Sequence, residues 1–143
     1  MKITCDKQTL VESVMNVQKA VSTKSCLAAL EGIFIKTKGE KLKLCGYDLE
    51  LGITTEIPCT IEEEGATILN AKILADIIRK APAETVSIST DLQSISTIKS
   101  GPAVFSIAGL STEDYPELPK VEDSKTINIQ GNILKSMIRQ TIF

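Results

Sequence analysis

Residues 66–81 constrain the fold more than any other stretch, because they combine an extended run, a helix cap and an amphipathic helix. Asn70 follows the extended run, and its side-chain oxygen can accept a hydrogen bond from an otherwise unpaired helical N–H. Pro82 then stops the helix. Apolar residues recur at helical spacing and predict one buried stripe, composed of Ile73, Leu74, Ile77, Ile78 and Ala81. Burial of its four branched side chains would contribute on the order of 6–12 kcal/mol before chain entropy. This stripe therefore fixes the fold, and the opposite, charged face is left free for a partner.

The same pattern recurs along the chain at a period of roughly sixty residues, which is typical of repeated architecture. A strand and an Asp6 cap precede an apolar stripe within residues 7–21, and a strand over 126–129 precedes apolar positions within 133–138. We predict an α+β fold built from two β-α-β-β-β repeats, with two helices on one side of antiparallel sheets. A third repeat begins and is cut off at Phe143.

Alternating apolar and polar residues predict strands after each of the first two helices, over residues 32–38, 41–45, 49–57, 85–90, 92–99 and 103–109. The run from Glu62 to Gly65 is acidic and predicts an exposed turn. Residues 110–123 show no period and contain two prolines, which is typical of a linker. The domain prediction is a first domain over 1–118, a linker over 119–125 and the truncated start of a second domain over 126–143.

The composition is that of an ordinary soluble globular protein, with 43% hydrophobic and 24% charged residues. No apolar run approaches the roughly 20 residues of a membrane helix, and the N-terminus shows no signal segment, so we expect a cytoplasmic location and no membrane contact. The cysteines lack metal-ligand spacing and predict free thiols rather than a zinc site: Cys5, Cys26, Cys45 and Cys59.

The net charge of −2 hides an uneven distribution. Seven basic residues against two acidic ones give the three helical segments +5, so the remainder carries −2 − 5 = −7. If the helices line one surface, that surface is basic and the outside is acidic, which would steer a polyanion to one face. The competing interpretation is that these charges only solvate helix faces. Lys24 lies in a hydroxyl-rich loop, where it could meet a phosphate or be an ordinary solvated residue.

No catalytic pattern is present. The chain has no histidine, no nucleophile elbow, no P-loop and no dinucleotide-binding motif. Asp48 and Glu50 could act as a carboxylate pair, but solvated carboxylates at a turn are the simpler interpretation. We expect no catalytic residue, no cofactor and no metal. Two other functions stay open: a protein-interaction module that uses the edge strand Phe105–Ile107, and a small enzyme.

Several segments resemble the bacterial DNA polymerase III β subunit, the sliding clamp, in order and spacing. They are Ala20-Val21-Ser22-Thr23-Lys24-Ser25, Gly46-Tyr47-Asp48-Leu49-Glu50, Glu63-Glu64-Gly65, Ile77-Ile78-Arg79-Lys80 and Glu113-Asp114-Tyr115-Pro116-Glu117-Leu118-Pro119. The resemblance covers the whole chain, with one departure at Ala28, where the family commonly has proline.

This resemblance implies a subunit of three similar domains, two copies of which close head to tail into a ring around duplex DNA, with the helices lining the hole. Such a homodimer is a processivity factor in DNA replication rather than an enzyme. Polymerase and clamp loader would bind through domains absent here. Carried over by position, Lys24 and Lys72 would face DNA, with Arg79 as their companion. The second-rank DNA-binding residues are Lys80, Lys135 and Arg139. The subunit interface would use Phe105 and Ile107 with Ile77 and Ala81 behind them.

Overall fold

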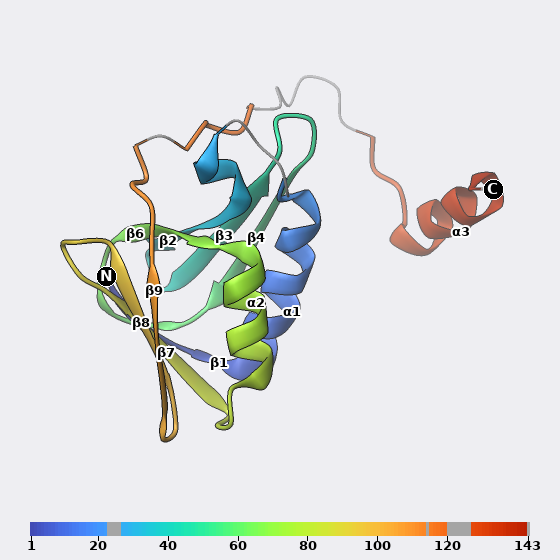
Figure 1. Cartoon of the computed structure of the whole chain (residues 1–143). Helices are drawn as coiled ribbons and strands as arrows, with labels where there is room; N and C mark the ends of the chain where they lie inside the picture. The colour runs from blue at the N-terminus through green and yellow to red at the C-terminus, as the bar shows by residue number, and fades with distance from the viewer. Residues whose placement is uncertain (23–26, 114, 120–126, 143) are drawn as a thin grey trace.

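The computed structural model describes residues 1–22, 27–113, 115–119 and 127–142. Helices α1 (Lys7–Val17) and α2 (Ala71–Lys80) lie side by side, on the same side of the strands (Figure 1). Two 3₁₀ turns, η1 (Gln18–Ala20) and η2 (Ala28–Glu31), lie between α1 and the next strand, and a third helix, α3 (Gly131–Thr141), follows the rest. The strands are β1 (Lys2–Asp6), β2 (Gly32–Lys38), β3 (Lys41–Tyr47), β4 (Gly52–Pro58), β5 (Thr60–Glu63), β6 (Ala66–Asn70), β7 (Thr85–Thr90), β8 (Ile95–Ser100) and β9 (Ala103–Ala108).

Side-chain caps start both packed helices, as the sequence predicts. The Asp6 carboxylate accepts hydrogen bonds from the Thr9 backbone N–H at 2.8 Å and from the Thr9 hydroxyl at 2.7 Å. The Asn70 side-chain oxygen accepts from the Ile73 N–H at 3.1 Å. Helix α2 ends at Lys80, and Ala81 has an extended ψ of 130°. Pro82 explains this ending, because the residue before a proline is disfavoured in the helical region.

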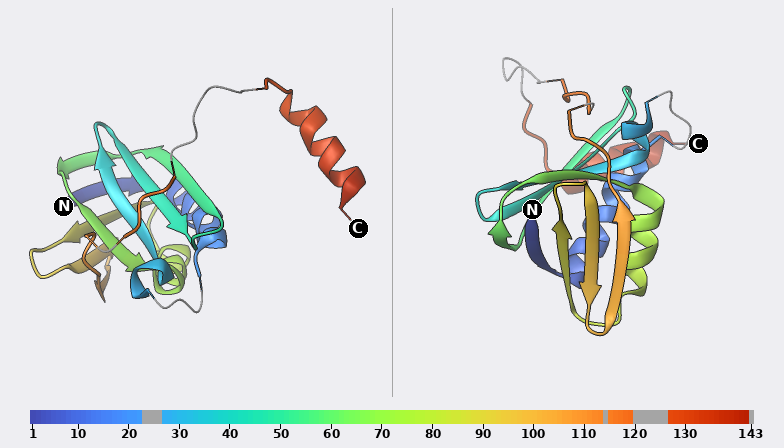
Figure 2. Two further views of the ribbon diagram at one scale, coloured as in Figure 1. Left: turned by 90° about the horizontal axis from the view of Figure 1, so that it is seen from above. Right: turned by 60° about the vertical axis from the view of Figure 1, so that its left-hand side comes forward.

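The strands form two antiparallel sheets whose strand directions differ clearly (Figure 2). Sheet A has the order β5-β1-β7-β8-β9, and sheet B has the order β4-β3-β2-β6. Each repeat gives its first strand to the sheet built from the other repeat's last three strands, so β9-β8-β7-β1 corresponds to β4-β3-β2-β6. The predicted α+β fold of two β-α-β-β-β repeats is confirmed, and the repeats are interlocked rather than stacked.

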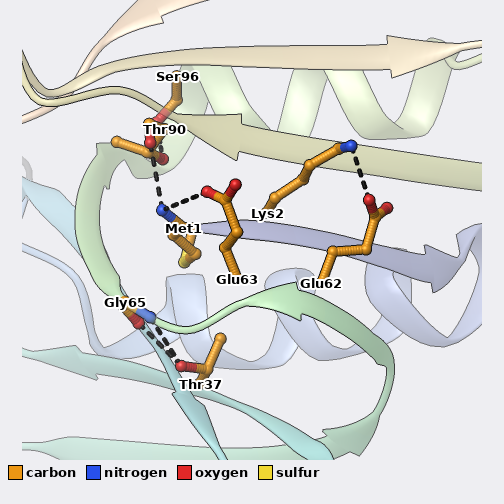
Figure 3. Close-up of polar contacts among 8 residues, drawn as sticks. All are labelled: Met1, Lys2, Thr37, Glu62, Glu63, Gly65, Thr90 and Ser96. Atoms are coloured by element: carbon orange, nitrogen blue, oxygen red, sulfur yellow. Dashed lines mark hydrogen bonds and ion pairs between the residues drawn. The ribbon is translucent and has the colours of Figure 1, made fainter.

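Strand β5 is the addition that the repeat does not predict. Glu62 and Glu63 lie in this strand, not in the exposed turn expected from their charge, and β5 pairs with β1 in the register Thr4↔Thr60. Without β5, β1 would be an edge with unpaired backbone groups. The acidic side chains also find cations: Lys2 Nζ lies 2.6 Å from a Glu62 oxygen, and the N-terminal ammonium lies 4.0 Å from Glu63 (Figure 3).

The core lies between the helix pair and the two sheets. From α1 it contains Leu10, Val14 and Val17, in agreement with the predicted stripe. The buried face of α2 differs from the prediction, because Ile73 is 48% exposed and Ile77 only partly buried. Ala71 and Ala75 are buried instead, beside Leu74 and Ile78. Alanine contributes little to apolar periodicity, so the sequence pattern placed the centre of the face too close to the isoleucines.

The residues after the first two repeats form less structure than predicted. Residues 127–130 are not a strand, since no partner strand pairs with them in the described chain. Helix α3 forms as predicted, but none of its residues is buried. Among the described residues, no helix has the length and apolar character needed to cross a membrane.

Candidate nucleic-acid interface

The side chains of α2 that point away from the core carry the predicted cations. Lys72, Arg79 and Lys80 are all exposed. Lys72 and Arg79 are seven residues apart, so they lie on nearly the same flank of the helix. Arg79 lines a hollow together with Gln8 and Glu12 of α1. Lys72 lines a second hollow with Val21 and Ser22, just beyond the end of α1. Both cations therefore lie along the line where the two helices meet.

Local partners divide these cations into two groups. The Arg79 guanidinium lies 2.6 Å from the Asp76 carboxylate, and Lys7 Nζ donates a hydrogen bond to the Ala81 carbonyl. Within the described chain, Lys72 and Lys80 form no ion pair. Five basic residues against two acidic ones leave α1, η1 and α2 with a formal charge of +3; they are Lys7, Lys19, Lys72, Arg79 and Lys80 against Glu12 and Asp76.

The outer face of sheet B contradicts the expectation of an acidic exterior. Its strands β2 and β3 bury Ile35 and Leu44, and the alternate positions point outward. Glu56 neutralises part of this face, at 2.8 Å from Lys38 and 4.0 Å from Lys41. The outward residues include four lysines: Lys36, Lys38, Lys41 and Lys43. The basic helix face is therefore not the only basic face, and summed charge along the chain could not reveal this.

The other predicted DNA-facing residues are separated from α2 along the chain. Lys24 lies outside the described residues. Lys135 and Arg139 are exposed on α3 and one helical turn apart.

The four predicted interface residues do not all reach the surface. Phe105 is 36% exposed on the edge strand β9, whereas Ile107 is only 6% exposed and Ala81 only 3%. Ile77 is partly buried against the core. Ile73, one turn before Ile77, and Val104 on β9 are exposed apolar residues that the sequence reasoning missed. Ile73 was missed because helical periodicity assigned it to the buried stripe. Val104 was missed because strand alternation assigned it to the opposite face of the strand from Phe105.

Asp48 has a structural role at its turn. Its carboxylate accepts hydrogen bonds from the backbone N–H groups of Leu51 at 2.6 Å and Glu50 at 3.0 Å. These bonds lower the pKa of Asp48. They hold a turn in which Leu49 has a positive φ of 79°. A carboxylate committed to two N–H groups is a turn cap, and in the described residues no group of acidic or cysteine side chains could hold a metal ion.

Tyr115 fixes the chain after β9 to the outer face of sheet B, a contact that the sequence reasoning did not predict. Its ring stacks on Phe34 with centroids 5.1 Å apart, and its hydroxyl donates to the Cys45 carbonyl at 3.3 Å. Burial raises the pKa of Tyr115. An aromatic residue directly before Pro116, in a segment whose composition predicts a linker, was the signal for this docking.

Comparison with known proteins gives one consistent result. Residues 1–119 match the family model of the DNA polymerase III beta subunit, N-terminal domain. The beta sliding clamp of Bacillus subtilis is 38% identical over the whole of this chain, and that of Halalkalibacterium halodurans is 34% identical. The chain spans 40% of the length of these relatives.

Solved structures agree. The DNA polymerase sliding clamp of Bacillus subtilis superposes with a TM-score of 0.94 at 38% identity, covering 99% of this chain and 39% of that one. A putative DNA polymerase III beta subunit from Eubacterium rectale gives a TM-score of 0.92 at 42% identity, covering 99% and 39%.

Proposed function

Because this chain belongs to the family of bacterial DNA polymerase III β subunits, the sliding clamps, we propose that it supplies the first domain of a ring around duplex DNA. The observation that carries the proposal is the helix pair, in which α1 and α2 lie side by side and together with η1 carry a net charge of +3 (Figure 1). Their exposed cations form a surface that suits a polyanion without offering a pocket for one base.

Contacts of this kind permit sliding. Lysine and arginine contacts to phosphates carry no sequence information, and each phosphate neutralised adds about −0.9 to the slope of log affinity against log salt. A ring retains DNA by topology, so individual contacts can be weak. In this proposal Lys72 and Lys80 contact phosphates directly. A phosphate would have to compete with Asp76 for the Arg79 guanidinium. Further contacts along the chain come from Lys24, Lys135 and Arg139.

Edge strand β9 is the proposed site of ring closure. Its free edge can pair with a strand of a second subunit, head to tail. Phe105 and Ile77 would contact that subunit, and the buried Ile107 and Ala81 would support them from below rather than touch the partner. We propose a homodimer of this kind for the complete subunit, with polymerase and clamp loader bound by segments outside this chain. The subunit acts in the cytoplasm as a processivity factor with no catalytic residue of its own.

The test distinguishes topological from ordinary binding. The complete subunit from this reading frame is loaded with its clamp loader onto a nicked circular duplex, and retention at high salt is measured before and after the circle is cut. We expect retention on the circle and release within seconds of linearisation, because only topology survives high salt. Equal retention on both forms would contradict the proposal.

A protein-interaction module is the second candidate, and the exposed edge of β9 favours it. It predicts salt-independent association with protein and no retention on either DNA form. That outcome would leave the role of Phe105 intact and remove the role of Lys72.

A further inference from the structure

Two cysteines face each other where the chain passes from sheet B to sheet A. Strand β1 pairs with β5 in the register Ile3↔Ile61 and Thr4↔Thr60, so the next opposed pair is Cys5 and Cys59. Residues directly opposite on antiparallel strands point to the same face of the sheet. Cys5 is 3% exposed and Cys59 is partly buried against the same core.

The backbone geometry brings these side chains close. The Cys59 N–H donates to the Glu40 carbonyl, not to β1. Cys5 and Cys59 therefore form a non-hydrogen-bonded pair, in which opposed Cα atoms are about 4.5 Å apart and side chains approach most closely. A disulfide requires Cα atoms roughly 4.4–6.8 Å apart. Both residues are free thiols in this structure.

We propose that Cys5 and Cys59 form a modification site, in which a small neutral or cationic disulfide oxidises them to one intramolecular disulfide. Cys59 reacts first, because it is the more accessible: its thiolate attacks one sulfur of the reagent, forms a mixed disulfide and releases one reagent thiol. The Cys5 thiolate then attacks the Cys59 sulfur and releases the second thiol. Two protein thiols are oxidised, one reagent disulfide is reduced to two thiols, and the protons of Cys5 and Cys59 end on those thiols.

The surroundings determine which reagents enter. Both cysteines line a hollow whose other lining residues include Asp6, Glu40, Glu62 and Glu64, and of these four Glu62 pairs with Lys2. These charges repel an anionic disulfide such as oxidised glutathione and attract a cationic one such as cystamine. Burial also raises the pKa of both thiols, that of Cys5 to about 12. Oxidation is therefore slow at neutral pH and accelerates as the pH rises, because the thiolate is the nucleophile.

The crosslink would fasten the junction between the sheets. Pro58 ends β4 in sheet B, and Thr60 begins β5 in sheet A, so Cys59 lies in the two-sheet crossover. A bond to Cys5 closes a long loop of the chain and restricts the unfolded state. We expect the midpoint of thermal unfolding to rise by roughly 5–10 °C on oxidation.

The experiment equilibrates the 143-residue chain with mixtures of reduced and oxidised 2-mercaptoethanol, natively and in guanidinium chloride. The protein is the Cys26→Ser/Cys45→Ala variant, which retains only Cys5 and Cys59. Trypsin then yields the peptides 3–7 and 44–72, and mass spectrometry counts the linked pair. Should this variant fail to fold, the wild type is mapped with a protease that cuts after Glu50 and Glu56, between Cys45 and Cys59.

We expect an equilibrium constant for the disulfide at least about tenfold larger in the native protein than in the unfolded one, because a crosslink that stabilises the fold is itself stabilised by the fold. Cystamine should react faster than oxidised glutathione, and Cys59→Ser should abolish the linked peptide and the thermal shift. An equal or smaller native constant would overturn the proposal, as would linkage of Cys5 to another cysteine in the wild type.

Discussion

Lys72 and Arg79 share one flank of α2 but differ in their partners, and this difference makes a prediction. Lys72→Ala should weaken binding to every duplex sequence equally and reduce the salt slope by about 0.9, because one phosphate contact is lost. Arg79→Ala should cost less, since Asp76 already holds that guanidinium at 2.6 Å. Fluorescence anisotropy of a short labelled duplex at low salt measures both effects in the complete subunit.

Matched variants sharpen this test. Asp76→Asn should tighten binding, because it frees Arg79 and removes a negative charge from the same face. Lys36→Ala removes an exposed lysine from the outer face of sheet B and should leave affinity unchanged. If Lys36→Ala weakened binding as much as Lys72→Ala, the helix pair would lose its special role and bulk charge would explain the binding.

Asp6 and Asp48 should make the fold sensitive to acid. Backbone N–H groups hold the pKa of each carboxyl below its ordinary value, those of Thr9 for Asp6 and of Leu51 for Asp48. A lowered folded pKa contributes stability that is present above the unfolded pKa, about 3.9, and is lost as the pH falls through the folded value. Thermal midpoints should therefore drop below about pH 4.

Asparagine at these positions still accepts hydrogen bonds but does not titrate. Asp6→Asn and Asp48→Asn should each flatten the acid limb of the midpoint-against-pH curve, and the double variant should flatten it further, because the sites are independent. An unchanged acid limb in the double variant would show that other carboxylates control acid unfolding.

Single-residue roles could be predicted from the sequence where the reason is local. The caps at Asp6 and Asn70 follow from residue type and position before an apolar stripe, and both form as expected. The pairing of Cys5 with Cys59 could not be predicted, because it depends on the register between β1 and β5. The acidic residues of β5 had led to the prediction of an exposed turn there. The basic outer face that lysines of β2 and β3 form could not be predicted for a similar reason. Only the folded sheet shows that these lysines point to the same side.

At the level of elements, α2 separates two residues that the sequence treats alike. Leu74 is fully buried, whereas Ile73 is 48% exposed. Leu74→Ala should lower the free energy of unfolding by about 2–5 kcal/mol, because it leaves a cavity in the core. Ile73→Ala should change it by less than about 0.5 kcal/mol. Urea unfolding followed by circular dichroism compares the two variants. Equal losses in the free energy of unfolding would support the buried stripe predicted from periodicity instead.

The docking of the segment after β9 predicts another graded pair. Tyr115→Phe removes only the hydrogen bond to the Cys45 carbonyl and should cost about 1 kcal/mol. Tyr115→Ala also removes the stacking on Phe34 and should cost about 3 kcal/mol or more. If both variants unfolded at the same urea concentration as the wild type, the segment would contribute nothing to the stability of the domain.

Element types were predictable because both helices and most strands have strong periodicity. The extent of β5 was not predictable. Its residues Thr60–Glu63 form a strand because they pair with the otherwise open edge of β1, not because of their own strand propensity. The missing strand over residues 127–130 shows the converse. Apolar and polar residues alternate there as in a strand. A strand without a partner would leave its backbone N–H and C=O groups unpaired, so none forms.

Across the whole molecule, the exchange of first strands makes the two repeats dependent on each other. Strand β1 completes the sheet of the second repeat and β6 completes that of the first, so neither repeat can bury its core alone. The domain should therefore unfold in one cooperative step, in spite of its internal repeat. Sequence periodicity predicted the repetition, but the exchange arises from long-range pairing that periodicity does not encode.

The completed domain leaves one edge of sheet A open at β9, and this edge governs how the 143-residue chain associates. Val104 and Phe105 are exposed apolar residues of this strand, so weak self-association is expected as concentration rises. A closed ring of this chain is not expected, because a head-to-tail interface needs two different surfaces and β9 would provide one of them in the proposed ring. Multi-angle light scattering should return the mass of one chain, 15.5 kDa, at low micromolar concentration.

Phe105→Glu should remove the weak association at higher concentration, whereas Leu92→Glu should not, because Leu92 lies fully exposed on the turn between β7 and β8. A stable closed dimer of this chain would mean that the second surface lies within these residues, and the proposed ring closure through segments outside them would have to be abandoned.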